Sequence, residues 1–158
     1  VFSDKASSKW KSEHKAETLR GEFKGEPVLL AKPQTFMNLS GESVVSLMNF
    51  YKISKEKLLV IHDELEFPFQ KFKFQKNRGH GGHNGVKSIS GLLGTADYTR
   101  LKLGIGRPAN PNQNVADYVL QKFSSEEFEH LSNYLNTACD AVEYFMQEGL
   151  QKASTKYN

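Results

Sequence analysis

The most informative segment for the architecture of this chain reads Lys57-Leu58-Leu59-Val60-Ile61-His62-Asp63-Glu64. Its first five residues form a short apolar run of the kind found in the central strands of buried sheets. Three polar residues follow at the carboxyl end of this run, where α/β proteins place their sites. The segment therefore predicts a buried strand and a candidate site at its end.

Strands and helices are predicted to alternate on both sides of this segment. We expect a β-hairpin with strands over residues 18–23 and 27–31, the second of them buried, and further strands over 72–75 and 98–105. Helices are expected to begin at a Ser40 cap, after the glycine-rich run at 79–85 and at a Ser124 capping box. This order predicts a layered α/β fold with a single domain over residues 1–158. The polar tail after Gly149 is expected to fray.

Composition restricts the class of protein. The chain has 158 residues, of which 38% are hydrophobic and 25% charged, as in globular proteins with a core. No apolar segment approaches the roughly 20 residues of a membrane-spanning helix, and the first residues lack a signal-peptide pattern. The single Cys139 cannot form an internal disulfide and is expected in the core. We therefore expect a cytoplasmic protein.

The run Gly79-His80-Gly81-Gly82-His83-Asn84-Gly85 places two imidazoles and a carboxamide among glycines. Glycines at this density indicate a backbone that needs positive φ or a close approach to another group. Imidazoles and amides in such a loop can exchange protons, hold water or bind a carbonyl. The run is a candidate site, although a surface turn that carries two histidines remains an alternative.

Asp63 is suited to orient an imidazole, as the acid of a catalytic triad does, although it could instead cap a turn. Asn38 and Asn84 could bind a peptide group or an oxyanion, while Asn38 could instead cap the following helix. A metal site built from His62, Asp63, His80 and His83 is a competing hypothesis. It is disfavoured because His80 and His83 do not share a helical face and no cysteine pair accompanies them.

Basic residues cluster around the glycine-rich run and the strand that follows it. They are Lys71, Lys73, Lys76, Arg78, Lys87, Arg100, Lys102 and Arg107. A phosphate-bearing partner would favour this distribution, even though the net charge is only +3. A solvated charged face is the alternative.

Four segments together resemble the bacterial-type peptidyl-tRNA hydrolase family. They are Pro33-Gln34-Thr35-Phe36-Met37-Asn38-Leu39-Ser40-Gly41, His62-Asp63-Glu64-Leu65, the glycine-rich run, and Gly104-Ile105-Gly106-Arg107-Pro108. Their order and separations fit the family, and the resemblance covers the chain from about Trp10 onward. It implies a single three-layer α/β/α domain with a twisted mixed β-sheet. It also implies a monomeric cytoplasmic enzyme without metal or cofactor, which hydrolyses the ester of peptidyl-tRNA and recycles tRNA from stalled or aborted translation.

The resemblance also implies roles for individual residues. Asp63 matches the acid that hydrogen-bonds the catalytic histidine, and Asn84 matches an amide that holds substrate and the reacting water. The substrate-binding residues it implies are Phe36, Met37, Asn38, His83, Asn84 and Lys102. Lys102 would be one of two basic residues that hold the 5′ phosphate of tRNA. The other falls at Gln75, which is uncharged, so Lys73 or Lys76 is expected to replace it, while His80 is expected to be structural.

One motif of the family is missing from these residues. Members begin with a strand and a Thr-Arg-His-Asn segment whose histidine is the general base, and the sequence contains neither. His14 lacks the flanking residues of that segment and is not assigned the role. We therefore expect the 158 residues to be N-terminally truncated relative to the family and impaired in hydrolysis. A catalytically silent tRNA- or RNA-binding relative is the alternative, and a metal-dependent hydrolase is a third hypothesis.

Overall fold

The computed structural model describes residues 9–158. It divides the chain into two compact units, which we describe separately. The first contains residues 9–57 and 78–96, and the second contains residues 58–77 and 97–158. Each unit contains a three-stranded sheet and helices. The mixed α/β class predicted from the sequence is confirmed.

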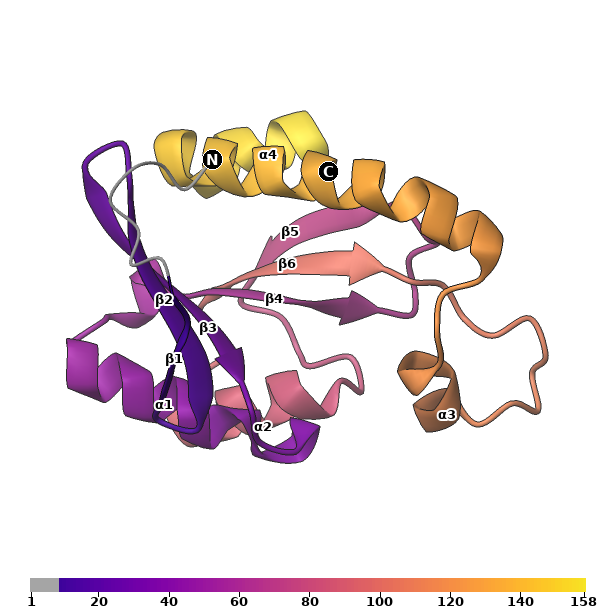
Figure 1. The fold of residues 1–158 in the computed structure, drawn as a ribbon, viewed down its shortest axis with the longest axis horizontal. Coiled ribbons are helices and arrows are strands. Elements are labelled where there is room, and N and C mark those ends of the chain that lie inside the picture. The colour runs from indigo at the N-terminus through magenta and orange to yellow at the C-terminus, as the bar shows by residue number, and fades with distance from the viewer. Residues whose placement is uncertain (1–8) are drawn as a thin grey trace. The chain divides into compact units, whose positions relative to one another are not determined.

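The first unit contains an antiparallel sheet in the order β1-β2-β3 (Figure 1). Its strands are β1 (Lys11–Glu13), β2 (Ala16–Phe23) and β3 (Glu26–Pro33). Lys24 and Gly25 form the two-residue hairpin turn with φ of 50° and 86°, the left-handed pair that such turns favour. The predicted hairpin is confirmed. The expectation that its second strand is buried is wrong, because β3 is an outer strand and none of its residues is buried.

The helices of the first unit are η1 (Met37–Leu39), α1 (Ser40–Tyr51), η2 (Lys55–Lys57) and α2 (Asn84–Leu93). Ser40 is not the cap that the sequence predicts. The 3₁₀ turn of η1 continues directly into α1, so Ser40 is the first residue of the helix, and its hydroxyl donates to the carbonyl of Met37 at 2.8 Å. Gly94 ends α2 with φ of 68°, as predicted.

Gly41 allows α1 and α2 to approach each other closely. A Cβ on Gly41 would lie 2.4 Å from the carbonyl oxygen of Ser88. The backbone N–H of Gly41 instead donates to the Ser88 hydroxyl at 3.0 Å. This contact fixes η1, which directly precedes α1, relative to the first turns of α2.

The second unit contains a mixed sheet in the order β4-β6-β5. Its strands are β4 (Leu59–Glu64), β5 (Phe72–Lys76) and β6 (Thr99–Gly104), with β4 parallel and β5 antiparallel to β6. The mixed sheet that the family resemblance implies is confirmed. Two helices follow, α3 (Val115–Leu120), which the sequence did not predict, and α4 (Ser125–Tyr157), which Figure 1 shows lying along the sheet.

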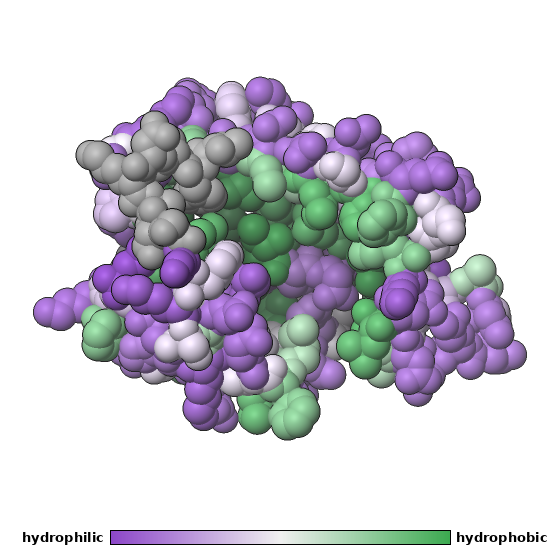
Figure 2. All heavy atoms as spheres, in the orientation of Figure 1, coloured by the Kyte–Doolittle hydropathy of each residue, from purple (hydrophilic) through white to green (hydrophobic). Residues whose placement is uncertain are grey.

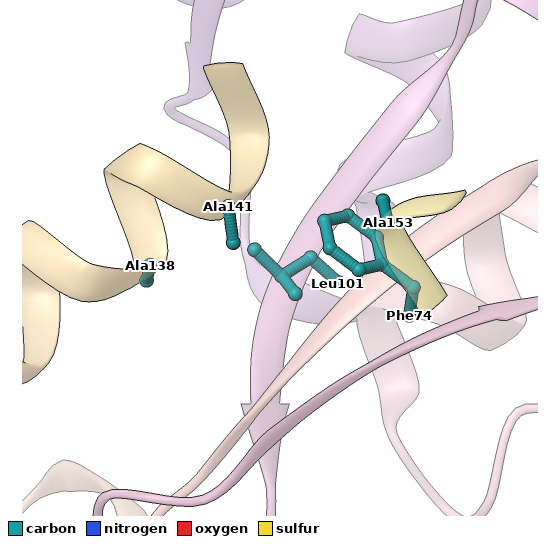
Figure 3. Close-up of a cluster of buried hydrophobic side chains, with 5 residues drawn as sticks. All are labelled: Phe74, Leu101, Ala138, Ala141 and Ala153. Carbon is teal, nitrogen blue, oxygen red and sulfur yellow. The ribbon is translucent and has the colours of Figure 1, made fainter. Parts of the chain in front are cut away.

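The core of the second unit lies between α4 and one face of this sheet. It is formed by Phe74, Leu101, Ala138, Ala141 and Ala153, which are all buried (Figure 3). Small alanines on the helix let its backbone approach the larger side chains of the strands. Figure 2 shows apolar side chains gathered beneath α4 and polar ones along its outer surface. The long helix is therefore amphipathic and held by packing.

Two expectations for α4 are wrong. The chain does not fray after Gly149: this residue breaks the helix with φ of 82°, but helix resumes to Tyr157. The polar tail is held because Ala153 is buried and the carboxamide of Asn158 makes two hydrogen bonds with the backbone of Phe74, at 2.7 and 3.0 Å. Cys139 is exposed and outside the core, because it follows Ala138 on the helix and points to the polar side.

Candidate functional site

The first unit brings together the residues around Asn38 and those around Asn84. A Cβ placed on Gly85, in the first turn of α2, would lie 2.6 Å from the sulfur of Met37 and 3.0 Å from Cε1 of His83. Met37 therefore packs directly against the start of α2. Met37 and Gly85 are 48 positions apart in the sequence and meet here because Gly85 has no side chain to keep their segments apart.

The glycine-rich loop is held by hydrogen bonds within itself. Gly81 and Gly82 have φ of 58° and 84°, which confirms the predicted need for positive φ. The N–H of Gly82 donates to Nδ1 of His80 at 3.1 Å, and the N–H of His83 donates to the carbonyl of His80 at 3.0 Å. These contacts tie the His80 ring into the turn that delivers His83 and Asn84.

His83 is the N-cap of α2. Its Nδ1 accepts a hydrogen bond from the N–H of Val86 at 3.2 Å. An imidazole nitrogen that accepts carries no proton, so the neutral ring has its proton on Nε2. The bond from Val86 fixes the imidazole of His83 at the start of α2.

The surface formed by these residues combines an apolar wall with polar groups. The side chains of Phe36 and Met37 are 81% and 56% exposed, far above what a core position would show. Asn38 and Asn84 are exposed, and His83 is half-buried. Two exposed carboxamides beside an exposed ring and thioether can bind an extended chain with apolar substituents.

A pocket of about 430 Å³ adjoins Phe36. Its lining comes from the β1–β2 turn, the loop after β3, η1 and the start of α1. It consists of Lys15, Gln34, Thr35, Phe36, Leu39 and Glu42. Lys15 and Glu42 form an ion pair at 2.7 Å at its rim. Phe36 therefore lines this pocket as well as the exposed surface beside Met37.

Asp63 and Lys102, the other two predicted site residues, belong to the second unit. Asp63 lies near the carboxyl end of β4, where the sequence predicts it, and is half-buried. The neighbouring His62 is buried, and its Nδ1 lies 2.6 Å from the carbonyl oxygen of Asp63. Because a carbonyl only accepts, Nδ1 of His62 donates this bond, which fixes its ring against the backbone.

Lys102 forms an ion pair with Glu64. The two side chains are only 14% and 7% exposed, and the ammonium also lies 5.1 Å from the centre of the Phe67 ring. The second oxygen of Glu64 accepts from the N–H of Glu66 at 3.0 Å. Burial acts to raise the pKa of Glu64, but the hydrogen bonds from Lys102 and the Glu66 amide outweigh it and hold the pKa below its usual value.

The strand register places a second lysine beside Lys102. Lys73 on β5 is directly opposite Lys102 on β6, and His62 on β4 is opposite it on the other side. Directly paired residues share one face of a sheet, so these three side chains and that of Glu64 line the same face. Gln75 shares this face, opposite Arg100, whereas Lys76 is on the other face and pairs with Asp97 at 3.5 Å.

Sequence reasoning missed the role of Glu64 and Gly85 in these arrangements. The alternation of β4 places Glu64 on the face of His62, which the sequence shows, but its contact with Lys102 depends on the pairing of β4 with β6. Among residues 9–158, no group of three or more histidine, cysteine, aspartate or glutamate side chains is placed to hold a metal ion. No helix in this part of the chain is long and apolar enough to cross a membrane.

Comparisons with known proteins converge on one family. A family model described as peptidyl-tRNA hydrolase matches residues 2–158. Proteins named peptidyl-tRNA hydrolase from Bdellovibrio bacteriovorus and Rhodococcus jostii are 62% and 42% identical over 148 and 158 residues. These matches cover 94% and 99% of this chain and 79% and 83% of the relatives.

Comparison with solved structures supports the same family. The crystal structure of peptidyl-tRNA hydrolase from Acinetobacter baumannii superimposes with a TM-score of 0.86 at 32% identity. The superposition covers 95% of this chain and 76% of that one. With a family model over nearly its whole length and relatives far above 30% identity, the chain belongs to the peptidyl-tRNA hydrolase family.

Proposed function

We propose that this protein hydrolyses the ester bond between the peptide and the tRNA of peptidyl-tRNA. The observation that carries the proposal is 62% identity over 94% of the chain to a protein named for that activity. The exposed carboxamides and apolar wall of the first unit supply a surface of the required chemistry. The identity favours the hydrolase over the alternative of a silent RNA-binding relative.

The peptide end of the substrate is assigned to the first unit. Asn38 and Asn84 hold the peptide backbone, and Asn84 also holds the reacting water and the negative oxygen that develops on the carbonyl. Phe36 and Met37 form the wall against which the peptide lies. His83, which caps α2 through Nδ1, lines the surface beside Asn84.

Asp63 is assigned to orient the histidine that acts as general base. That histidine takes a proton from water while the water oxygen attacks the ester carbonyl. The bond from the carbonyl carbon to the tRNA oxygen then breaks, and the proton is returned to that oxygen. A carboxylate that accepts from the other imidazole nitrogen fixes the tautomer that this transfer needs.

We infer that this base is a histidine outside the 158 residues, because they contain no Thr-Arg-His-Asn segment. The sheet of the second unit is compatible with a further strand: within residues 9–158, nothing pairs with the outer edge of β4, and Ile61 on that strand is 51% exposed. The 158 residues alone are then expected to hydrolyse slowly, since loss of a general base costs about 10²- to 10⁴-fold.

The tRNA end of the substrate is assigned to the second unit. Lys102 binds the 5′ phosphate, and Lys73 is its partner in place of the uncharged Gln75. The register favours Lys73 over Lys76, because Lys73 faces Lys102 directly, whereas Lys76 is on the opposite face and paired with Asp97. We further propose that the protein acts as a cytoplasmic monomer without a metal or cofactor, and that residues 1–158 act as one domain.

The proposal is tested by the release of N-acylated amino acid from acylated tRNA. The chain as given and a chain extended at its N-terminus with the segment that precedes Val1 in its gene are compared, with and without a chelator. We expect measurable release by the given chain, much faster release by the extended chain, and no effect of the chelator. Near-zero release by both chains would refute hydrolysis, and loss of activity with chelator would establish the metal-dependent hypothesis instead.

A further inference from the structure

The ammonium of Lys102 is already bound to a carboxylate. Glu64 contacts it directly, and both side chains are largely removed from solvent. Surface ion pairs hold little energy because water screens them, but a pair with this burial interacts strongly. The positive charge that a phosphate would meet at Lys102 is therefore largely cancelled by Glu64.

The carboxylate is itself held firmly in place. One oxygen of Glu64 contacts Lys102 and the other accepts from the N–H of Glu66. Both oxygens of the carboxylate are therefore held in place. The lowered pKa of Glu64 keeps this group negative at neutral pH. Lys73, His62 and the buried Arg100 are the other basic residues on this face next to Lys102. The face thus carries a fixed negative charge among its positive ones.

If the proposed function holds, a phosphate site at Lys102 must bind tRNA without holding it too tightly. The ester that is cleaved is on the 3′-terminal ribose of the tRNA, so the 5′ phosphate is chemically identical in substrate and product. Energy from such a contact binds substrate, transition state and product equally, which lowers KM without raising kcat. A phosphate site that is too strong retains the tRNA after cleavage and slows release.

We propose that Glu64 weakens the phosphate site at Lys102, and so limits how tightly the protein holds its tRNA product. Glu64 acts through Lys102 and does not touch the reacting atoms. This inference rests on the proposed function, and specifically on the assignment of the 5′ phosphate to Lys102.

The test uses deacylated tRNA with either a 5′ phosphate or a 5′ hydroxyl, and measures its dissociation constant at several salt concentrations. In wild type, the phosphorylated tRNA should bind more tightly. Glu64→Gln keeps the shape of the side chain and removes its charge. It should strengthen binding of phosphorylated tRNA roughly three- to tenfold, the effect of one partly buried charge, and steepen the salt dependence by up to about one unit.

Glu66→Gln is the matched control. It removes the same charge two residues away, from an exposed carboxylate that pairs with Arg107 and does not contact Lys102. We expect less than about a twofold change in binding. The 5′-hydroxyl tRNA is a second control, for which Glu64→Gln should have little effect.

Lys102→Met separates this inference from a purely structural role of the pair. It should abolish the preference for 5′-phosphorylated tRNA, and adding Glu64→Gln to it should change binding no further. If Glu64→Gln alone does not fold, Glu64→Ala replaces it, and the same gain in binding of phosphorylated tRNA is expected. Weaker binding by Glu64→Gln, an equal gain in the Lys102→Met background, or no phosphate preference in wild type would each overturn the inference.

Hydrolysis measured on the same proteins keeps the two proposals distinguishable. Release of N-acylated amino acid with no phosphate preference would refute the inference and leave the function intact. Absence of release and of tRNA binding in the extended chain would refute the function itself. In that extended chain, Glu64→Gln should lower both KM and kcat, because product release becomes slower.

Discussion

Asn38 and Asn84 in the first unit are exposed, whereas Glu64 and Lys102 in the second have side chains only 7% and 14% exposed. The first pair is placed by backbone: a 3₁₀ turn, glycines with positive φ and a helix cap. The second pair is placed by strand register and by its own ion pair. Exposed groups on a fixed backbone are suited to bind a substrate that arrives from water. The buried pair is suited to set how much positive charge Lys102 presents to a phosphate.

Asp63 should show the largest effect in this comparison of the two units. It is placed by a strand, as Glu64 is, but is proposed to contact the catalytic histidine directly. Asp63→Asn in the extended chain should reduce turnover by about 10²- to 10⁴-fold, because the amide cannot stabilise a charged imidazole. Release of N-acylated amino acid measures the effect. Asp97→Asn, at a half-buried aspartate paired with Lys76, is the control and should keep wild-type turnover. Wild-type turnover in Asp63→Asn would remove Asp63 from the mechanism.

Gly41 tests how far the first unit depends on backbone contact. In Gly41→Ala the new methyl meets the Ser88 carbonyl at 2.4 Å, and backbone cannot yield as a side chain can. We expect a loss of roughly 1–3 kcal/mol in the free energy of unfolding, measured with urea. Gly91→Ala in α2 has open space around it and should instead stabilise, by up to about 1 kcal/mol. Equal stabilities would show that α1 and α2 separate freely.

Tyr134 tests the corresponding support in the second unit. Its hydroxyl on α4 donates to the carbonyls of Lys71 and Gly104, at 2.8 and 3.3 Å, beside the end of β6. Tyr134→Phe leaves these carbonyls without that donor, and we expect it to cost about 1–2 kcal/mol at neutral pH.

The same residue predicts a pH dependence. Burial raises the pKa of Tyr134 to about 12, above an ordinary value near 10. The folded state therefore holds the phenolic proton more tightly, and the resulting stability is complete below pH 10 and lost between pH 10 and 12. Wild type should lose about 2–3 kcal/mol more than Tyr134→Phe across this interval in urea unfolding. Equal losses of unfolding free energy in the two proteins would show that Tyr134 does not cause this pH dependence.

Gly85 carries the smallest expected effect. An added methyl would meet only the side chains of Met37 and His83, which can move. Gly85→Ala should therefore change stability by less than about 1 kcal/mol, yet raise KM several-fold by displacing part of the substrate wall. Gly79→Ala has open space and a φ outside the left-handed region, and should leave KM unchanged. An unchanged KM in Gly85→Ala would show that the wall tolerates displacement.

The difference between the two regions also explains what could be predicted from the sequence. The glycine-rich run, the capping box at Ser124 and the alternation of β5 are local patterns, and the structure confirms each. The prediction that β3 is buried is wrong, because an apolar run looks alike in a strand at the edge of a sheet and in one at its centre.

The ion pair of Lys102 and Glu64 could not be predicted from local sequence patterns, because it depends on which strands pair. Nearly forty residues separate the two in sequence, and they meet only because β4 pairs with β6 in one register. The fraying expected after Gly149 was wrong because local composition shows polarity but not the contact that Asn158 makes with a strand. Whether each predicted site residue acts as assigned stays a prediction.

The carboxamide of Asn158 has a consequence beyond fixing its helix. It accepts from the N–H and donates to the C=O of Phe74, the same pair of bonds that a residue of a neighbouring strand would make. β5 is the last strand of its sheet in the part of the chain that the structure describes. One side chain thus occupies, at Phe74, the two backbone groups to which a strand of another molecule would bond, and this disfavours edge-to-edge pairing at that residue.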